Sequence, residues 1–304
     1  MTRVASLTPP FADVNVIKQE DGSVEVVVCF VPDPDKIAGE NETRAALAID
    51  ASRSIKDWFG TPGMFGKPDL ISPVIKKLGN ILCGITKKED LSVFYWALGK
   101  GDDVEDLGTL TSEQFGKLET PGPSKGNWGK GTQILPAVKR IFENIGGDCP
   151  WVMGVIITDG KIEDETECIE YCMDVGRWLK NNPEITRKLV LIGVGDEVDE
   201  KQLDRLDDMF EETELKDDDI DLWACKAVAK IESEQQIIDV LFGELMGNIE
   251  IASSGKVLDS SGNVVQTFSD GLMGKFRFTL PAGCKSFTLQ AGGNEIEQDI
   301  SSAL

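Results

Sequence analysis

Apolar and polar segments alternate along the chain in a way that divides it into three parts. Between about residues 44 and 246, near-continuous apolar runs alternate with amphipathic stretches, which predicts strands buried on both faces and helices that cover them. We expect strands at residues 45–50, 90–98, 152–158, 188–195 and 221–228, and helices at 70–85, 133–145, 164–181, 199–209 and 231–246. This middle part is therefore predicted to be a Rossmann-like α/β domain with a mostly parallel sheet.

Both ends of the chain have a β pattern instead. After a loose tail at residues 1–10, the segment 1–32 is expected to hold a hairpin whose turn is Asp21-Gly22. Turn signals after Gly247 separate short strands, which are expected at residues 249–253, 256–258, 263–268, 273–280, 286–290 and 295–300. Residues 248–304 are only about 57 residues, few for a sandwich on their own. We therefore expect the N-terminal hairpin to complete a small antiparallel β-sandwich, with the α/β domain inserted between its two pieces.

Composition excludes several classes of function. The 304 residues carry a net charge of −22, which argues against binding to nucleic acid or to an anionic membrane surface. The chain contains no histidine, so Ser-His-Asp catalysis, Cys-His catalysis and histidine-ligated zinc are excluded. Any enzyme activity would have to depend on carboxylates, lysine, cysteine or a metal ion.

The sequence also bears on the cellular compartment. No apolar run approaches the roughly 20 residues of a membrane span, and the first residues lack the apolar core of a signal peptide. The seven cysteines are odd in number and lie mostly in apolar stretches, which is typical of reduced thiols in a protein core. We expect a cytoplasmic protein with no membrane partner.

The residues with the clearest chemistry follow the first strand of the α/β domain. Asp50, Ser52 and Ser54 place one carboxylate and two hydroxyls at alternate positions after the apolar run 45–49. Ligands of α/β sheets bind at the carboxyl ends of the strands, and oxygen side chains suit Mg²⁺, Mn²⁺ or Ca²⁺. Taken alone, the two serines could equally cap the helix that follows.

Two later segments supply further oxygen ligands. Thr132 ends a glycine-rich loop just before the predicted helix 133–145, and Asp159 lies in a Thr-Asp-Gly sequence at the carboxyl end of the strand 152–158. Together with water, these five side chains could complete an octahedral shell around a divalent cation.

This set of residues, in this order, resembles the metal-ion-dependent adhesion site of von Willebrand factor A domains. The resemblance covers about residues 44–246 and implies that Asp50, Ser52, Ser54, Thr132 and Asp159 bind a divalent cation, with Mg²⁺ the first choice. In that family the hydroxyls contact the ion, the aspartates act directly or through water, and a carboxylate of a partner protein fills the open position. The implied function is cation-dependent protein binding without catalysis.

The resemblance also suggests a setting. Intracellular members of the family commonly act as adaptors in multi-protein systems, for example beside AAA+ ATPases of the MoxR kind, and the chain is bacterial in style. The oligomeric state and the partner's identity are left open by the sequence.

One alternative function depends on the same residues. A metal-dependent hydrolase or phosphatase could use Asp50 and Asp159, although aspartyl-phosphate enzymes usually carry a second aspartate where this chain has Ser52. The segment around Lys130 does not match a phosphate-binding loop, because glycine follows the lysine. Trp58, Phe59, Met64 and Phe65 lie in a loop at residues 58–69, where they could form an apolar rim for a partner or pack locally.

Overall fold

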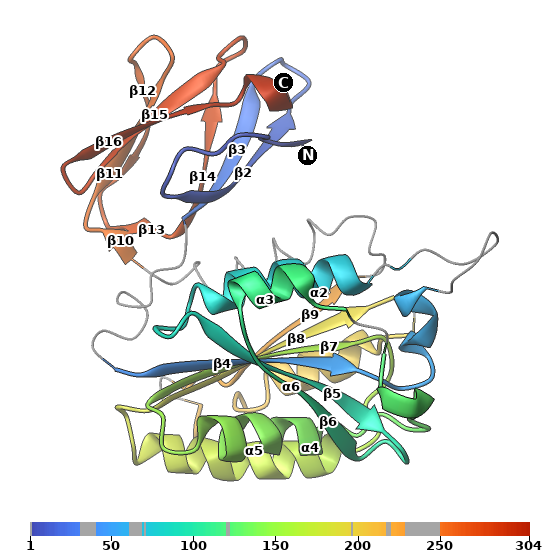
Figure 1. Ribbon diagram of the computed structural model, residues 1–304. Helices are drawn as coiled ribbons and strands as arrows, with labels where there is room; N and C mark the ends of the chain where they lie inside the picture. Colours follow the sequence, from blue (N-terminus) through green and yellow to red (C-terminus); the bar gives the residue numbers. More distant parts are fainter. Residues whose placement is uncertain are drawn as a thin grey trace. The chain divides into compact units, whose positions relative to one another are not determined.

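The computed structural model describes residues 2–30, 41–60, 69, 71–119, 122–195, 197–216, 220–228 and 250–304. The chain divides into two compact units. Unit 1 combines Met1–Ile37 with Leu241–Leu304, and unit 2 is Ala38–Val240. The two ends of the chain therefore belong to one unit, and the middle forms the other (Figure 1). Within the described residues, no helix is both long enough and apolar enough to cross a membrane.

Unit 2 is built on a six-stranded sheet with the strand order β6-β5-β4-β7-β8-β9. The strands are β4 (Thr43–Asp50), β5 (Asp90–Leu98), β6 (Asp103–Thr111), β7 (Trp151–Thr158), β8 (Thr186–Val194) and β9 (Trp223–Val228). Every neighbouring pair is parallel except β5 and β6, which are antiparallel. The predicted mostly parallel sheet is confirmed, because the apolar runs of the sequence form its interior strands.

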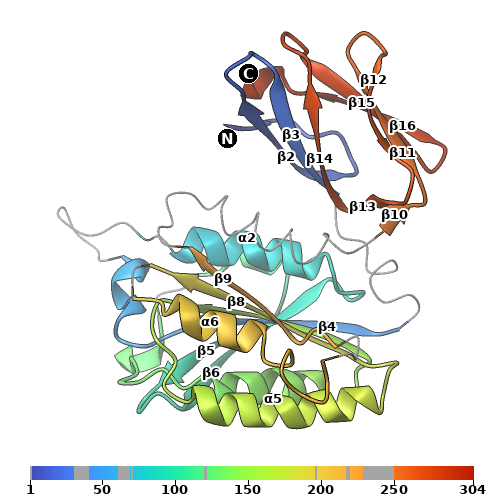
Figure 2. The ribbon, with the colours of Figure 1, turned by 180° about the vertical axis from the view of Figure 1, so that it is seen from behind.

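Helices cover both faces of this sheet. The elements are η1 (Ile55–Phe59), α2 (Ile71–Cys83), α3 (Ser112–Lys117), η2 (Ser124–Gly126), α4 (Leu135–Lys139), the π-helix η3 (Arg140–Gly146), α5 (Glu165–Lys180) and α6 (Glu200–Asp207). Figure 1 shows α2 and α3 on one face and α4 and α5 on the other, and Figure 2 shows α6 from behind. Ala46 and Ala48 of β4 belong to the core cluster under α4, α5 and α6. Their neighbours Leu47 and Ile49 are equally buried, so β4 is covered on both faces. The predicted helix 231–246 lies outside the described residues.

The direction in which successive strands are added to the sheet reverses at β4. The chain continues from β4 to β5 on one side of the sheet and later returns to β7 on the other side. Such a switch point leaves a crevice at the carboxyl ends of the two diverging strands, where α/β proteins bind ligands. Asp50, the last residue of β4, lies at this point.

The sequence pattern does not predict β6. This strand carries Asp103, Glu105 and Asp106, and none of its residues is buried. It is an edge strand held by backbone pairing to β5, so its side chains need no apolar alternation. The short helix α3 that follows is likewise not among the predicted helices.

The helix expected at 133–145 begins later than predicted and changes type. It starts as α4 at Leu135 and continues from Arg140 as the π-helix η3. The first backbone N–H groups are bound by a distant side chain, because Asp164 accepts hydrogen bonds from Ile134 N at 2.7 Å and from Leu135 N at 2.9 Å. This tertiary contact replaces a local capping residue, which is why the sequence misplaces the start.

Replacing Asp164 tests this contact. Asp164→Ala leaves two partly buried N–H groups without their acceptor, so we expect the free energy of unfolding to fall by about 1 to 3 kcal/mol. Glu167→Ala, an exposed change in the first turn of α5, is the matched control and should change it by less than about 0.5 kcal/mol. Urea unfolding measures both, and equal stability of the two variants would contradict the assignment.

Unit 1 contains two four-stranded antiparallel sheets, which confirms the antiparallel β structure predicted for the two ends of the chain. One has the order β1-β2-β3-β14 and the other β12-β11-β15-β16, and a two-stranded ribbon joins β10 to β13. The bounds are β1 (Thr2–Arg3), β2 (Phe11–Lys18), β3 (Val24–Phe30), β10 (Glu250–Ala252), β11 (Gly255–Asp259), β12 (Val264–Phe268), β13 (Leu272–Met273), β14 (Lys275–Leu280), β15 (Ser286–Ala291), β16 (Asn294–Asp299) and the short helix η4 (Ser301–Ala303).

Pairing of β3 with β14 joins the two ends of the chain, as the sequence predicts. Phe287 of β15 packs against Phe278 of β14 and Phe11 of β2, with ring centroids 4.9 Å and 5.9 Å apart, so aromatic side chains fill the space between the two sheets. Two details differ from expectation. Thr2–Arg3 pairs with β2 although the first ten residues were expected to be loose, and the strand predicted at 273–280 is broken at Gly274.

Candidate metal centre

The carboxylate of Asp50 is fixed on both of its oxygens. It is fully buried at the end of β4, where Oδ1 accepts a hydrogen bond from Ser52 N at 2.6 Å. Oδ2 accepts one from the hydroxyl of Thr158, at the end of β7, at 2.7 Å. The two strands that diverge at the switch point therefore share this carboxylate, which holds their ends in register.

A chain of hydroxyls links Asp50's loop to the second predicted aspartate. Ser52 Oγ and Ser54 Oγ are 2.9 Å apart, and Ser54 Oγ donates to Asp159 Oδ1 at 2.8 Å. Ser54 stands just before η1, but its side chain makes no capping hydrogen bond. The helix-cap interpretation of Ser54 is therefore wrong, and four of the five predicted residues form one cluster.

The fifth residue, Thr132, is carried by a loop that is pinned to the same edge. Ser52 and Gly129 form a parallel bridge, with Gly129 N donating to Ala51 O at 2.9 Å and Arg53 N donating to Gly129 O at 3.0 Å. Thr132 is buried, and its carbonyl accepts a hydrogen bond from Glu163 N at 2.9 Å, which ties the loop to the segment after Asp159. Within the described part of the chain, the hydrogen-bonded cluster does not extend to the Thr132 hydroxyl.

The approach of this loop requires a glycine. A Cβ atom built on Gly129 would lie 1.6 Å from Ala97 O, closer than any non-bonded contact allows. Ala97 itself has a φ of 60°, in the left-handed region that non-glycine residues rarely adopt. The backbone at the end of β5 therefore leaves room for the glycine-rich loop to lie against the end of β4.

Two carboxylates at this edge are costly to ionise. Burial raises the pKa of Asp50, and burial together with the charge of Asp50 raises the pKa of Asp159 to about 7. Glu197, in the segment after β8, adds to the effect on Asp159. Among the described residues, no lysine or arginine forms an ion pair with Asp50 or Asp159. A cation bound here would compensate charges that the protein itself leaves uncompensated.

The donor set fits a hard divalent cation. Two carboxylates and three hydroxyls are all oxygen donors, the type that Mg²⁺, Mn²⁺ and Ca²⁺ prefer. The described residues contain no group of three or more cysteine, aspartate and glutamate side chains arranged to hold a metal ion, so such a site would depend on its hydroxyls. Thr158 was not among the predicted site residues, although its place beside Asp159 in the Thr-Asp-Gly sequence is a usable signal.

Aromatic side chains next to the cluster are half-buried and pack on one another. The ring of Phe59 lies edge-on to Trp128 with centroids 5.2 Å apart and to Tyr95 at 6.1 Å. Trp58 lies against Gly195, where an added Cβ would be 3.1 Å from the indole. These contacts are local packing, in which Tyr95 is buried and Trp58, Phe59 and Trp128 are half-buried. Met64 and Phe65 lie outside the described residues.

Comparisons with known proteins give matches only among solved structures. No protein-family model matches the chain, and no curated protein matches it. The chain is similar to the pilus adhesin SpaC from Lactobacillus rhamnosus GG, with a TM-score of 0.46 and 8% identity over 99% of this chain and 48% of that one. It thus spans about half the length of SpaC.

Two further structures are similar to this chain. One is the N-terminal domain of TFIIH p34, with a TM-score of 0.39 and 11% identity over 69% of this chain and 100% of that one. The other is the human COPII-coat protein Sec24c, with a TM-score of 0.34 and 8% identity over 92% of this chain and 46% of that one.

Proposed function

We propose that this chain is a von Willebrand factor A-like protein-binding module whose metal-ion-dependent adhesion site holds Mg²⁺. The ligands would be Asp50, Ser52, Ser54, Thr132 and Asp159. A carboxylate from a protein partner would occupy the remaining coordination position. The bound ion would supply the positive charge that attracts this carboxylate.

One observation carries the proposal. Asp50 and Asp159 come from two strands on opposite sides of the switch point, yet Ser52 and Ser54 join them. Ser52 N donates to Asp50, the two serine hydroxyls are within hydrogen-bond distance of each other, and Ser54 Oγ donates to Asp159. Both carboxylates are almost fully buried and have no cationic partner among the described residues. Buried carboxylates are normally paired or coordinate a metal, so the arrangement is typical of a cation site.

The residues of the site would have different roles toward the cation. Thr158 and Ser52 N hold the Asp50 carboxylate in one orientation, so that it need not reorganise when a cation arrives. The hydroxyls of Ser52, Ser54 and Thr132 contribute no charge of their own. An ion held by neutral hydroxyls and two aspartates keeps part of its affinity for a further anionic ligand, which favours a partner's aspartate or glutamate.

The arrangement does not favour catalysis by Asp50. A nucleophilic carboxylate needs an accessible oxygen, but both oxygens of Asp50 accept hydrogen bonds and the residue has no exposed surface. The half-buried Trp58, Phe59 and Trp128 instead offer an apolar border on which a protein partner could pack.

Thr132 provides a direct test, because its hydroxyl stands outside the hydrogen-bonded cluster. Thr132→Val keeps the shape of the side chain and removes only a ligand oxygen. We expect it to weaken Mg²⁺ binding by about ten-fold or more, comparable to the loss of one charge-assisted contact, with little change in the stability of the metal-free protein. Isothermal titration calorimetry of the full chain with MgCl₂ measures the affinity.

Thr109→Val is the matched control, because Thr109 lies exposed on β6 away from the cluster. The same two variants and the wild type, used to capture partners from a lysate of the source cells with MgCl₂ or EDTA, test the second half of the proposal. Capture by the wild type should require Mg²⁺ and be lost in Thr132→Val. Capture that persists in EDTA would show that binding does not involve the ion.

A further inference from the structure

A pocket of about 390 Å³ lies at the end of the unit 2 sheet opposite to the candidate metal centre. Its walls come from the π-helix η3, from α5 and from the start of β8, and they include Phe142, Tyr171, Trp178 and Arg187. Arg187 pairs with Val152 near the start of β7, six residues before Thr158 at the other end of that strand. Because a strand rises by about 3.3 Å per residue, the pocket and the metal centre are about 20 Å apart.

The guanidinium of Arg187 is buried but has no carboxylate partner. The residue is only 4% exposed, and its Nη1 donates to Cys149 O at 2.9 Å and to Thr186 O at 3.0 Å. Its Nη2 donates to Gly147 O at 3.0 Å. These bonds use three of the five N–H groups of an arginine, and none of the described residues accepts from Nε. Nε and the remaining N–H of Nη2 are therefore available to a ligand.

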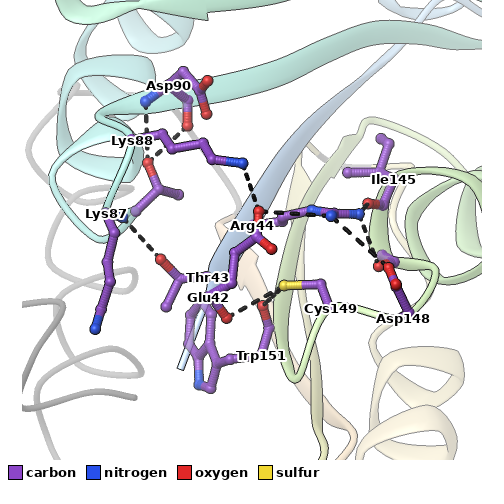
Figure 3. A network of polar contacts seen from close by, with 12 residues as sticks. Glu42, Thr43, Arg44, Lys87, Lys88, Asp90, Ile145, Asp148, Cys149 and Trp151 are labelled. Atoms are coloured by element: carbon purple, nitrogen blue, oxygen red, sulfur yellow. Dashed lines mark hydrogen bonds and ion pairs between the residues drawn. The ribbon is translucent and has the colours of Figure 1, made fainter. Parts of the chain in front are cut away.

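A second arginine, Arg44, binds the same turn but has acidic partners. Arg44 donates to Ile145 O at 3.0 Å, on the same turn that Arg187 holds, and it also forms ion pairs with Glu42 at 3.6 Å and Asp148 at 3.9 Å (Figure 3). Holding the turn thus does not by itself require an arginine without an acidic partner. Since buried charges are usually paired, the uncompensated charge of Arg187 points to an anion from outside the chain.

The two acidic side chains on the pocket wall are already engaged. Asp174 forms an ion pair with Arg177 at 2.9 Å. Burial raises the pKa of Tyr171, and a side-chain hydrogen bond with Glu143 raises it further. They leave Arg187 without an anion, and one negative charge on a ligand would match its single uncompensated charge. A ligand with one negative charge therefore suits the pocket better than a doubly charged phosphate.

The remaining wall is aromatic, and its largest side chain is accessible. Trp178 is 43% exposed, although it is a large apolar side chain, and the Arg187 guanidinium lies 5.5 Å from the centre of its ring. Tyr171 and Phe142 complete the aromatic surface. A volume near 400 Å³ is at the lower end of the range for small-molecule sites, about 300 to 1,000 Å³, so it would accept a ligand of one or two rings.

We propose that this pocket binds a small aromatic carboxylate, whose ring packs on Trp178, Tyr171 and Phe142 and whose carboxylate receives hydrogen bonds from Nε and Nη2 of Arg187. Arginine presents a planar pair of N–H groups that matches a carboxylate, which gives the site its selectivity for this group. The site is separate from the proposed metal centre and does not depend on it.

The test compares probes that share a ring and differ in the charged group. Benzoate and 3-phenylpropionate are titrated against the full chain beside benzamide, benzylamine and phenyl phosphate, with binding followed by ligand-observed NMR. We expect both carboxylates to bind about ten-fold or more tightly than benzamide, since hydrogen bonds to charged groups have this effect, and benzylamine and phenyl phosphate to bind more weakly than the carboxylates. Benzamide or phenyl phosphate binding as tightly as benzoate, or no binding by any probe at millimolar concentration, would overturn the proposal.

Three variants assign the effect to residues. Arg187→Gln should abolish the preference for carboxylate over amide, Trp178→Ala should weaken every aromatic probe alike, and Arg44→Gln is the matched control that should leave the preference unchanged. Circular dichroism reports whether each variant folds. If Arg187→Gln does not fold, Trp178→Ala still tests the proposal, because Trp178 is exposed and its replacement should not prevent folding. Unchanged benzoate binding in Trp178→Ala would show that the ligand binds elsewhere.

Discussion

Asp159→Asn is expected to abolish the stabilisation of this protein by Mg²⁺ while leaving the metal-free chain at least as stable as the wild type. Most substitutions of buried residues destabilise, so the expected sign is unusual. It follows because Asp159 is buried beside the fully buried Asp50, so the amide removes a desolvated charge that no described cation balances. The amide oxygen can still accept the hydrogen bond from Ser54.

Thermal unfolding with and without Mg²⁺ measures this effect. For the wild type, a concentration one hundred times the dissociation constant should stabilise the fold by about 2.7 kcal/mol, and for Asp159→Asn the same concentration should have no effect. Asp102→Asn, an exposed change in the loop after β5, is the matched control and should behave as the wild type does. Equal stabilisation of Asp159→Asn by Mg²⁺ would exclude this residue from the site.

Gly129→Ala is expected to be the most damaging single-methyl change in the candidate site. The new Cβ would lie 1.6 Å from Ala97 O, and the Gly129 backbone is fixed by hydrogen bonds from Gly129 N to Ala51 O and from Arg53 N to Gly129 O. One of the strand ends must move, so we expect a loss of about 3 kcal/mol in the free energy of unfolding. Because the same loop carries Thr132, Mg²⁺ affinity should fall as well.

Gly116→Ala is the control for this substitution. Gly116 lies in α3, where an added Cβ meets nothing within 4 Å, so alanine should be neutral or stabilise by up to about 1 kcal/mol. Chemical denaturation of the two variants beside the wild type compares them. If Gly129→Ala were as stable as Gly116→Ala, the close approach of the loop to β5 would not be a feature of the folded protein.

Sequence patterns predicted the interior strands well because those strands are buried on both faces. The runs at 45–50, 90–98 and 152–158 correspond to β4, β5 and β7 almost to the residue. Burial on two faces demands apolar side chains at successive positions, and that demand is visible in one dimension. β6 lacks the signal, because an exposed edge strand is held by hydrogen bonds that any sequence can make.

The start of the helix after Thr132 shows a second limit of prediction from the sequence. The N–H groups at its start are bound by Asp164, thirty residues along the chain from Ile134. A capping residue can be read from a sequence only when it is local, and this one is not. The same reasoning applies to Arg187, whose lack of an acidic partner is a property of its neighbours in space.

The sequence by itself determined which chemistry this protein can offer. A chain without histidine that ends two apolar strands with Asp50, Ser52, Ser54 and Asp159 has oxygen ligands and few alternatives, and the parallel topology predicts that these strand ends lie at one edge. Only the tertiary structure decided how the ligands are held. It joined Asp50 to Thr158, joined Ser54 to Asp159 and placed Gly129 against Ala97, because hydrogen bonds and steric contacts between segments far apart in the sequence depend on distances that a sequence does not contain.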